Sequence, residues 1–228
     1  MGVGSLPRGH AGAARYDAPH GLLPLAFVIV VPTIVLGAVV LQPWIPPDVL
    51  LRDPLAVGVA TGECCPPYYG AISNLGVLIW AAAASVGLFT ALVLGSLGRW
   101  SALSFPLASG LLTGLLTLDD LYMLHDRVLP YLGVPEHVVY GVYGLLALAY
   151  LLRFHGELRA GSLPILLIAV AAFAASVLLD QLPQVSDTHH VLIEDGAKFA
   201  GIVAWAVYQI EVMLRLLSRV RWSGALTR

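Results

Sequence analysis

The stretch AISNLGVLIWAAAASVGLFTALVLGSL, which runs from Ala71 to Leu97, contains no charged side chain. It is longer than the roughly 20 residues that an α-helix needs to cross the hydrocarbon core of a bilayer. Five further runs are similarly apolar: Leu22–Leu41, Ala102–Leu124, Val138–Leu152, Leu163–Leu179 and Val191–Leu217. The sequence therefore predicts an all-α fold, a polytopic membrane bundle of about six transmembrane helices.

The overall composition agrees with a membrane protein. Of the 228 residues, 58% are hydrophobic and 11% are charged, and the mean hydropathy is +0.84. A soluble domain has roughly 25% charged residues, with which it covers its surface. The net charge of −2 and the lack of a basic stripe exclude a nucleic-acid partner. We expect the lipid bilayer to be the main partner.

The chain divides into one membrane domain and two short ends. We expect a cytoplasmic segment at residues 1–21, a single six-helix domain at residues 22–217 and a basic cytoplasmic tail at residues 218–228. Residues 42–70 contain six prolines and are expected to form a stiff outer cap. The first apolar run is too long for the core of a signal peptide and no cleavage site follows it, so it should remain as an anchor.

The cations set the expected orientation. Nine of the twelve lysine and arginine residues fall on one side of the alternating spans: Arg8, Arg15, Arg99, Arg153, Arg159, Arg215, Arg219, Arg221 and Arg228. Arg52 and Arg127 fall on the other side. Because positive residues accumulate in cytoplasmic loops, we expect both termini in the cytoplasm of a bacterium and the protein in its inner (plasma) membrane.

Ionisable residues occur at one depth in several spans. Counting 1.5 Å per residue places Asp119 and Asp120 about 25 Å along the third span, near the outer edge of the hydrocarbon. Polar residues at the same height in other spans are Ser73, Asn74, Asp180, Glu194, Asp195 and Lys198. An ionisable group in a span costs several kcal/mol unless it is paired or faces water, so this layer is a candidate functional site.

Helical spacing suggests how the layer is arranged. If the third span continues as an α-helix, Asp119, Tyr122 and Asp126 share one face and converge. Glu194 and Lys198 stand four residues apart, in the favourable order for an ion pair. Capping of a helix N-terminus is an alternative explanation for Glu194 and Asp195. It does not explain the aspartates at the C-terminal ends of spans, which need a cation, a proton or a metal.

Histidines on the outer side extend the layer. Histidine with Asp or Glu is a ligand set for zinc, iron or manganese, whereas oxygen ligands suit calcium. The expected ligands of a divalent metal, zinc first and calcium as the alternative, are Asp119, His125, Asp126, Asp180, His189 and His190. Their spacing matches no standard zinc motif, and a surface or hydrogen-bonding role for each histidine stays open.

Two cysteines lie in the cap. Cys64 and Cys65 are adjacent, which excludes a CxxC metal or redox motif. Buried structural thiols, an intermolecular bridge and ligation of a soft metal remain as alternatives, because neighbouring residues rarely suit a disulfide.

Two segments carry a family resemblance. The first is Gly62-Glu63-Cys64-Cys65 followed by Ile72-Ser73-Asn74-Leu75, and the second is Leu118-Asp119-Asp120-Leu121-Tyr122-Met123. They resemble segments of the membrane hydrolase superfamily that includes the alkaline ceramidases and the adiponectin-receptor-like proteins. The chain differs from these proteins in having six predicted spans instead of seven and in lacking their paired HxxxH motif. Their zinc triad is therefore not carried over. The combination of Asp119–Asp126 with Leu192–Trp205 also resembles uncharacterised bacterial multi-pass membrane proteins.

Two functions follow as hypotheses. The first is a divalent-metal-dependent hydrolase of a lipid-like or amide substrate, with Glu194 or Asp195 as proton acceptor and Asn74 as a polarising donor. The alternative is a non-enzymatic protein, either an ion or proton translocator or an accessory subunit. Translocation needs polar groups through the membrane, and the candidates below the outer layer are sparse: Thr90, Ser109, Thr113, Ser176, Gln209 and Glu211.

The orientation is testable with topology reporters. Fusions at Arg99, at Glu157 and at the C-terminus should all report the cytoplasm, because nine cations against two favour this alternation across six spans. A fusion within residues 42–70 serves as the outer control. A periplasmic signal from any of the three positions contradicts the orientation.

Overall fold

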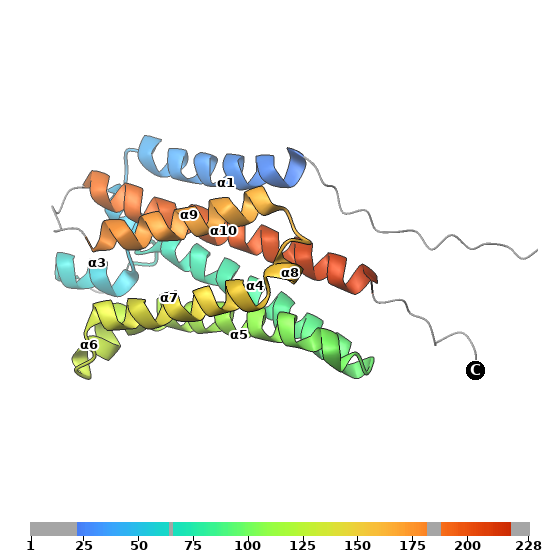
Figure 1. Cartoon of the computed structure of the whole chain (residues 1–228). Coiled ribbons are helices and arrows are strands. Elements are labelled where there is room, and N and C mark those ends of the chain that lie inside the picture. The colour runs from blue at the N-terminus through green and yellow to red at the C-terminus, as the bar shows by residue number, and fades with distance from the viewer. Residues whose placement is uncertain (1–21, 64–65, 182–187, 220–228) are drawn as a thin grey trace, which may run out of the picture.

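The computed structural model describes residues 22–63, 66–181 and 188–219, and within these ranges it is helical without any strand. Six long helices in the described residues run along a common axis (Figure 1): α1 (Leu22–Leu41), α4 (Ala71–Ser96), α5 (Trp100–Tyr122), α7 (Glu136–Arg153), α9 (Leu163–Asp180) and α10 (Thr188–Arg219). Residues 1–21, Cys64, Cys65 and the tail beyond Arg219 lie outside the description, so the expectations for them are not addressed.

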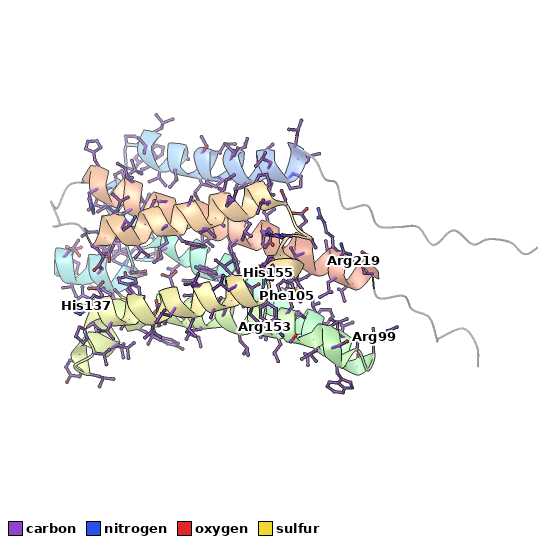
Figure 2. All side chains as sticks on the ribbon, in the orientation of Figure 1. Arg99, Phe105, His137, Arg153, His155 and Arg219 are labelled. Carbon is purple, nitrogen blue, oxygen red and sulfur yellow. The ribbon has the colours of Figure 1, made fainter. Side chains whose placement is uncertain are left out.

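Shorter helices occupy the two ends of the bundle. They are α2 (Pro47–Leu51), α3 (Pro54–Thr61), the π-helical turn η1 (Leu124–Val128), α6 (Leu129–Tyr131) and α8 (His155–Leu158). We call the end with α3 and α6 the cap end and the opposite end the basic end (Figure 1). Figure 2 shows Arg99 and Arg219 at the basic end and His137 at the cap end. The start of α1 and the end of α10 both lie toward the basic end.

Five of the described helices, α1, α4, α5, α9 and α10, are long and apolar enough to cross a membrane. They match five of the six predicted runs, with ends that differ by a few residues. The sixth run corresponds to α7, which has 18 residues and carries Glu136 in its first turn and Arg153 in its last. At 1.5 Å per residue α7 is about 27 Å long, close to the hydrocarbon thickness.

Several of the helices, α1 and α9 most of all, bury little of their apolar surface against the others. In α1 the buried residues are Val28, Pro32 and Val39, whereas Phe27 and Ile34 are more than half exposed. Large exposed apolar surfaces of this kind are not stable in water and suit contact with lipid. The chain is therefore an all-helical membrane protein.

The central helices approach closely through glycine. In α4 and α5, Gly87 and Gly110 face each other so tightly that a Cβ on Gly110 would lie 2.7 Å from the backbone nitrogen of Leu88. In α10, a Cβ on Gly201 would lie 2.8 Å from the ring of Phe173 in α9. Small residues at such crossings let membrane helices approach and gain van der Waals contact. These contacts set α5 close against α4 and α10 close against α9.

The cap is fastened to the start of α4. The backbone N–H of Gly70 donates to the carbonyl of Val49 at 2.9 Å, and the Ser73 hydroxyl donates to Oδ1 of Asp53 at 2.7 Å. Pro47 and Pro54 begin α2 and α3, as expected for a residue that fits the first helical turn. The cap therefore places Arg52 and Asp53 over the ends of the long helices.

The crossing of α4 and α5 can be tested with two matched substitutions. Gly110→Ala should destabilise the protein by about 1–3 kcal/mol, because the added methyl group meets the backbone of α4. Gly114→Ala in the same helix should be neutral or stabilising, since its Cβ would meet Ala84 Cβ at an ordinary 3.9 Å. Thermal unfolding in detergent measures both. Equal unfolding midpoints for the two variants would contradict the close crossing.

Candidate functional site

The predicted polar residues gather at the cap end. They come from the C-terminal ends of α5 and α9, from η1 and from the start of α10. We call this set the cap-end polar layer, and its members are Asp119, Asp120, His125, Asp180, His190, Glu194, Asp195 and Lys198. Within the layer, side chains are joined in two groups, one around Asp119 and Asp180 and one around Asp120.

Asp119 is the centre of the first group. Its side chain is buried and accepts three hydrogen bonds. The Tyr143 hydroxyl donates to Oδ1 at 2.8 Å, and the backbone N–H of His125 donates to the same oxygen at 3.0 Å. Nδ1 of His125 lies 2.5 Å from Oδ2. These partners compensate for the cost of a carboxylate at a helix C-terminus, where the dipole is unfavourable.

A break in the helix brings His125 back onto Asp119. Met123 adopts a left-handed conformation with φ of 50° and its N–H caps the carbonyl of Asp119. The predicted convergence of Asp119, Tyr122 and Asp126 was wrong, because the α-helix does not continue past Tyr122. Tyr122 is exposed, and Asp126 is an exposed side chain that binds Arg127 at 3.2 Å.

The environment of His125 favours its protonated form. Burial lowers the pKa of the imidazole, but the hydrogen bond to Asp119 and the charge of that carboxylate together outweigh burial and raise the pKa above its ordinary value of 6.5. The contact with Asp119 therefore favours the imidazolium form of His125 over the neutral form.

Tyr140 connects His125 to Asp180. The Tyr140 hydroxyl donates to Oδ2 of Asp180 at 3.0 Å, and its ring lies 5.0 Å from the ring of His125. The carboxyl group of Glu194 lies near that of Asp180. Glu194 in turn contacts Nδ1 of His190 at 3.3 Å. His189, next to His190, is exposed.

The second group is built on an ion pair between a buried aspartate and a partly buried lysine. The Lys198 ammonium contacts Oδ1 of Asp120, so the predicted pair of Lys198 with Glu194 was wrong. The reason is tertiary: Lys198 extends from α10 to the end of α5, while Glu194 turns toward His190 and Asp180. Asp195 lies beside the Lys198–Asp120 pair and lines the same small cavity.

The sequence analysis did not identify two tyrosines that bind carboxylates of the layer. Tyr140 and Tyr143 lie three residues apart in α7 and follow Glu136 on one helical face, a spacing that was available as a signal. Ser73, and not Asn74, lines the cavity; Asn74 is exposed. The structure therefore leaves Asn74 and Asp126 outside the hydrogen bonds of the layer. Among the described residues, no three His, Cys, Asp or Glu side chains are grouped as a metal site requires.

A second polar network lies deeper in the bundle. The Trp205 indole N–H donates to the hydroxyl of Thr113 at 3.0 Å. The Ser109 hydroxyl donates to Oε1 of Gln209 at 2.7 Å and accepts from the Tyr150 hydroxyl at 2.9 Å. All five side chains are buried. Three of the sparse candidates named from sequence, Ser109, Thr113 and Gln209, are thus parts of one network.

The two networks share one register between α5 and α10. Lys198 pairs with Asp120, Trp205 with Thr113 and Gln209 with Ser109. Each step along α10 is matched by an equal step back along α5, as antiparallel helices require. From Asp120 to Ser109 this series of bridges covers about 16 Å of helix. We call it the polar ladder.

One family model matches most of the chain. Residues 24–212 match the model of a family described as a domain of unknown function, DUF8692. The chain belongs to this family. The match runs from α1 into α10, so the cap-end polar layer and the polar ladder both lie inside the DUF8692 region. No curated protein and no solved structure matches the chain.

Proposed function

We propose that this DUF8692 protein moves protons across a bacterial inner membrane, as a six-span protein with both termini in the cytoplasm. Support for six spans comes from the length of α7 and from the start of α1 and the end of α10, which lie toward the same end (Figure 1). Only an even number of crossings gives that arrangement. The excess of arginine at the basic end supports its cytoplasmic position.

The polar ladder is the observation that carries this proposal. Buried polar side chains are costly in a membrane, and there they usually mark an ion pathway or a proton relay. The ladder joins α5 to α10 from the cap end to the middle of the bundle. Toward the basic end, the Tyr208 hydroxyl donates to the Leu158 carbonyl at 2.5 Å, and Glu211 pairs with Arg215.

The residues divide into proton donors and acceptors and residues that hold them. At the cap end, the His125–Asp119 pair and the Asp180–Glu194 pair each hold a proton close to the surface. Asp120 is the buried acceptor, and Lys198 stabilises its charged form. The hydroxyls of Thr117 and Thr113 donate to the backbone carbonyls of Thr113 and Ser109 at 2.8 Å, so transfer along α5 requires these hydroxyls to rotate or water to lie between them. Trp205 and Gln209 orient the hydroxyls of Thr113 and Ser109 through their hydrogen bonds.

The test is proton flux in liposomes that contain the full-length protein and a trapped pH-sensitive dye. A potassium gradient with valinomycin drives the flux. Asp120→Asn should reduce flux about tenfold or more, because an amide cannot take up the proton. Asp126→Asn is the matched control, since that exposed carboxylate at the same end is outside the ladder. Wild-type flux equal to that of protein-free liposomes contradicts the proposal.

A second candidate is the metal-dependent hydrolase, favoured by the two histidines. His125 and His190 each direct Nδ1 to a carboxylate, the arrangement that orients metal-binding histidines. Nε2 of His190 is buried and has no hydrogen-bond partner in the described part of the chain. Zinc would have to draw Nε2 of His190 and His125 and the Asp180 carboxylate together, because these side chains are not grouped as a metal site among the described residues. Zinc there would lower the pKa of a water for attack on a lipid-like ester or amide.

Elemental analysis of the purified protein distinguishes this candidate. Zinc should co-purify near one equivalent, and His190→Ala should reduce it several-fold because a ligand is lost. His155→Ala is the control. His155 begins α8, far from the cap end, and its Nδ1 contacts the Leu152 carbonyl (Figure 2). Protein that neither co-purifies with zinc nor rebinds it after chelation excludes the hydrolase.

A further inference from the structure

A small cavity lies where the cap meets α4, α5 and α10. Its volume is about 10 Å³, enough for about one water molecule or one ion of similar size. The polar residues that line it are Ser73, Asp120, Asp195 and Lys198, and the remaining lining is apolar: Leu51, Ile72, Gly76, Phe199 and Ile202. The cavity is therefore a small, partly open space in which four polar side chains meet an apolar wall.

One carboxylate oxygen in the cavity is left without a partner. Oδ1 of Asp120 contacts Lys198, while Oδ2 is buried and has no hydrogen-bond partner within the described ranges. The Asp120 side chain as a whole is only 6% exposed. A buried acceptor of this kind costs about 1–3 kcal/mol, and more when it is charged, unless something in the cavity binds it. Oδ2 therefore indicates an occupant.

The charges around the cavity do not balance. Asp120 contacts the Lys198 ammonium, Asp53 and Asp195 act on its charge from farther away, and Arg52 is the second cation near Asp195. Three carboxylates thus face two fixed positive charges. Two further charged groups lie near, and each has its own partners: Glu194 contacts His190 and lies near Asp180, and His125 binds Asp119. α4 contributes Ser73 without charge. The cluster can take one more positive charge.

We propose that this cavity binds one small monovalent cation, Na⁺, through Oδ2 of Asp120, the Asp195 carboxylate and Oγ of Ser73. Ser73 donates its proton to Asp53, which leaves its lone pairs free for a cation. Oxygen atoms are the ligands that hard cations prefer. Carboxylate oxygens form a site of high field strength, and such a site favours the smaller Na⁺ or Li⁺ over K⁺. The inference rests on the proposed function and extends it, because Na⁺ there competes with protons for the same carboxylates.

The test compares cations at constant ionic strength. The full-length protein is unfolded by heat in detergent with NaCl, KCl or choline chloride. Because a ligand of the folded state stabilises it, raising NaCl from 1 to 100 mM in place of choline should raise the unfolding midpoint by about 3 °C or more. KCl should give less than half of that shift. Equal midpoints in all three salts overturn the proposal and indicate a cavity that holds water alone.

Variants assign the effect to the cavity. Asp195→Asn and Ser73→Ala should each abolish most of the sodium-dependent shift, while Asp126→Asn should keep it. Equilibrium dialysis of the wild type with radioactive sodium is the second measurement, and it requires no variant to fold. About one bound Na⁺ supports the proposal, and none overturns it. If proton flux depends on Asp120 but no sodium binds, only the sodium site is contradicted. If sodium binds but no proton flux occurs, only the proton-transfer proposal is contradicted.

Discussion

The structure depends on the need to pair every buried polar side chain within a bundle that lipid surrounds. No water is present in the hydrocarbon core to solvate a charge, so Lys198 and Asp120 are stable there only together. The same requirement joins Trp205 to Thr113 and Gln209 to Ser109. Three bridges in one register hold α5 antiparallel to α10, and the glycine crossings place α4 beside both helices. The position of each site residue follows from this arrangement.

The cap end differs from the rest because the helices stop there. Past Tyr122, α5 gives way to a left-handed residue and a π-helical turn, which reverses the path of the backbone and returns His125 to Asp119. The carboxylates at the ends of α5 and α9 bind side chains of neighbouring elements, among them Tyr143 and Tyr140 of α7. Such irregular turns are frequent at functional sites. The concentration of proton-holding groups at this break is consistent with chemistry at the membrane surface.

Hydropathy predicted much of the arrangement of the helices, but it did not predict which side chains pair. The apolar runs located five helices that can span a membrane, and the depth of Asp119, Asp120, Asp180 and Glu194 along them was enough to place the polar layer. The predicted side-chain contacts were wrong wherever the prediction considered the spacing along one helix alone. Glu194 and Lys198 have ideal spacing for an ion pair, yet a carboxylate from another helix offered Lys198 a stronger, buried partner. Local spacing cannot rank competing partners from distant segments.

The sequence by itself determined the helical class, the apolar spans and the end of the bundle at which acids and histidines gather, because a bilayer imposes length and polarity on every segment that crosses it. The tertiary structure decided which side chains meet. Ser109, Thr113 and Gln209 are isolated in sequence and become a ladder only when α5 and α10 lie antiparallel. The missing hydrogen-bond partner of Asp120 Oδ2 is a property of the folded bundle alone, since it depends on which helices pack around that oxygen.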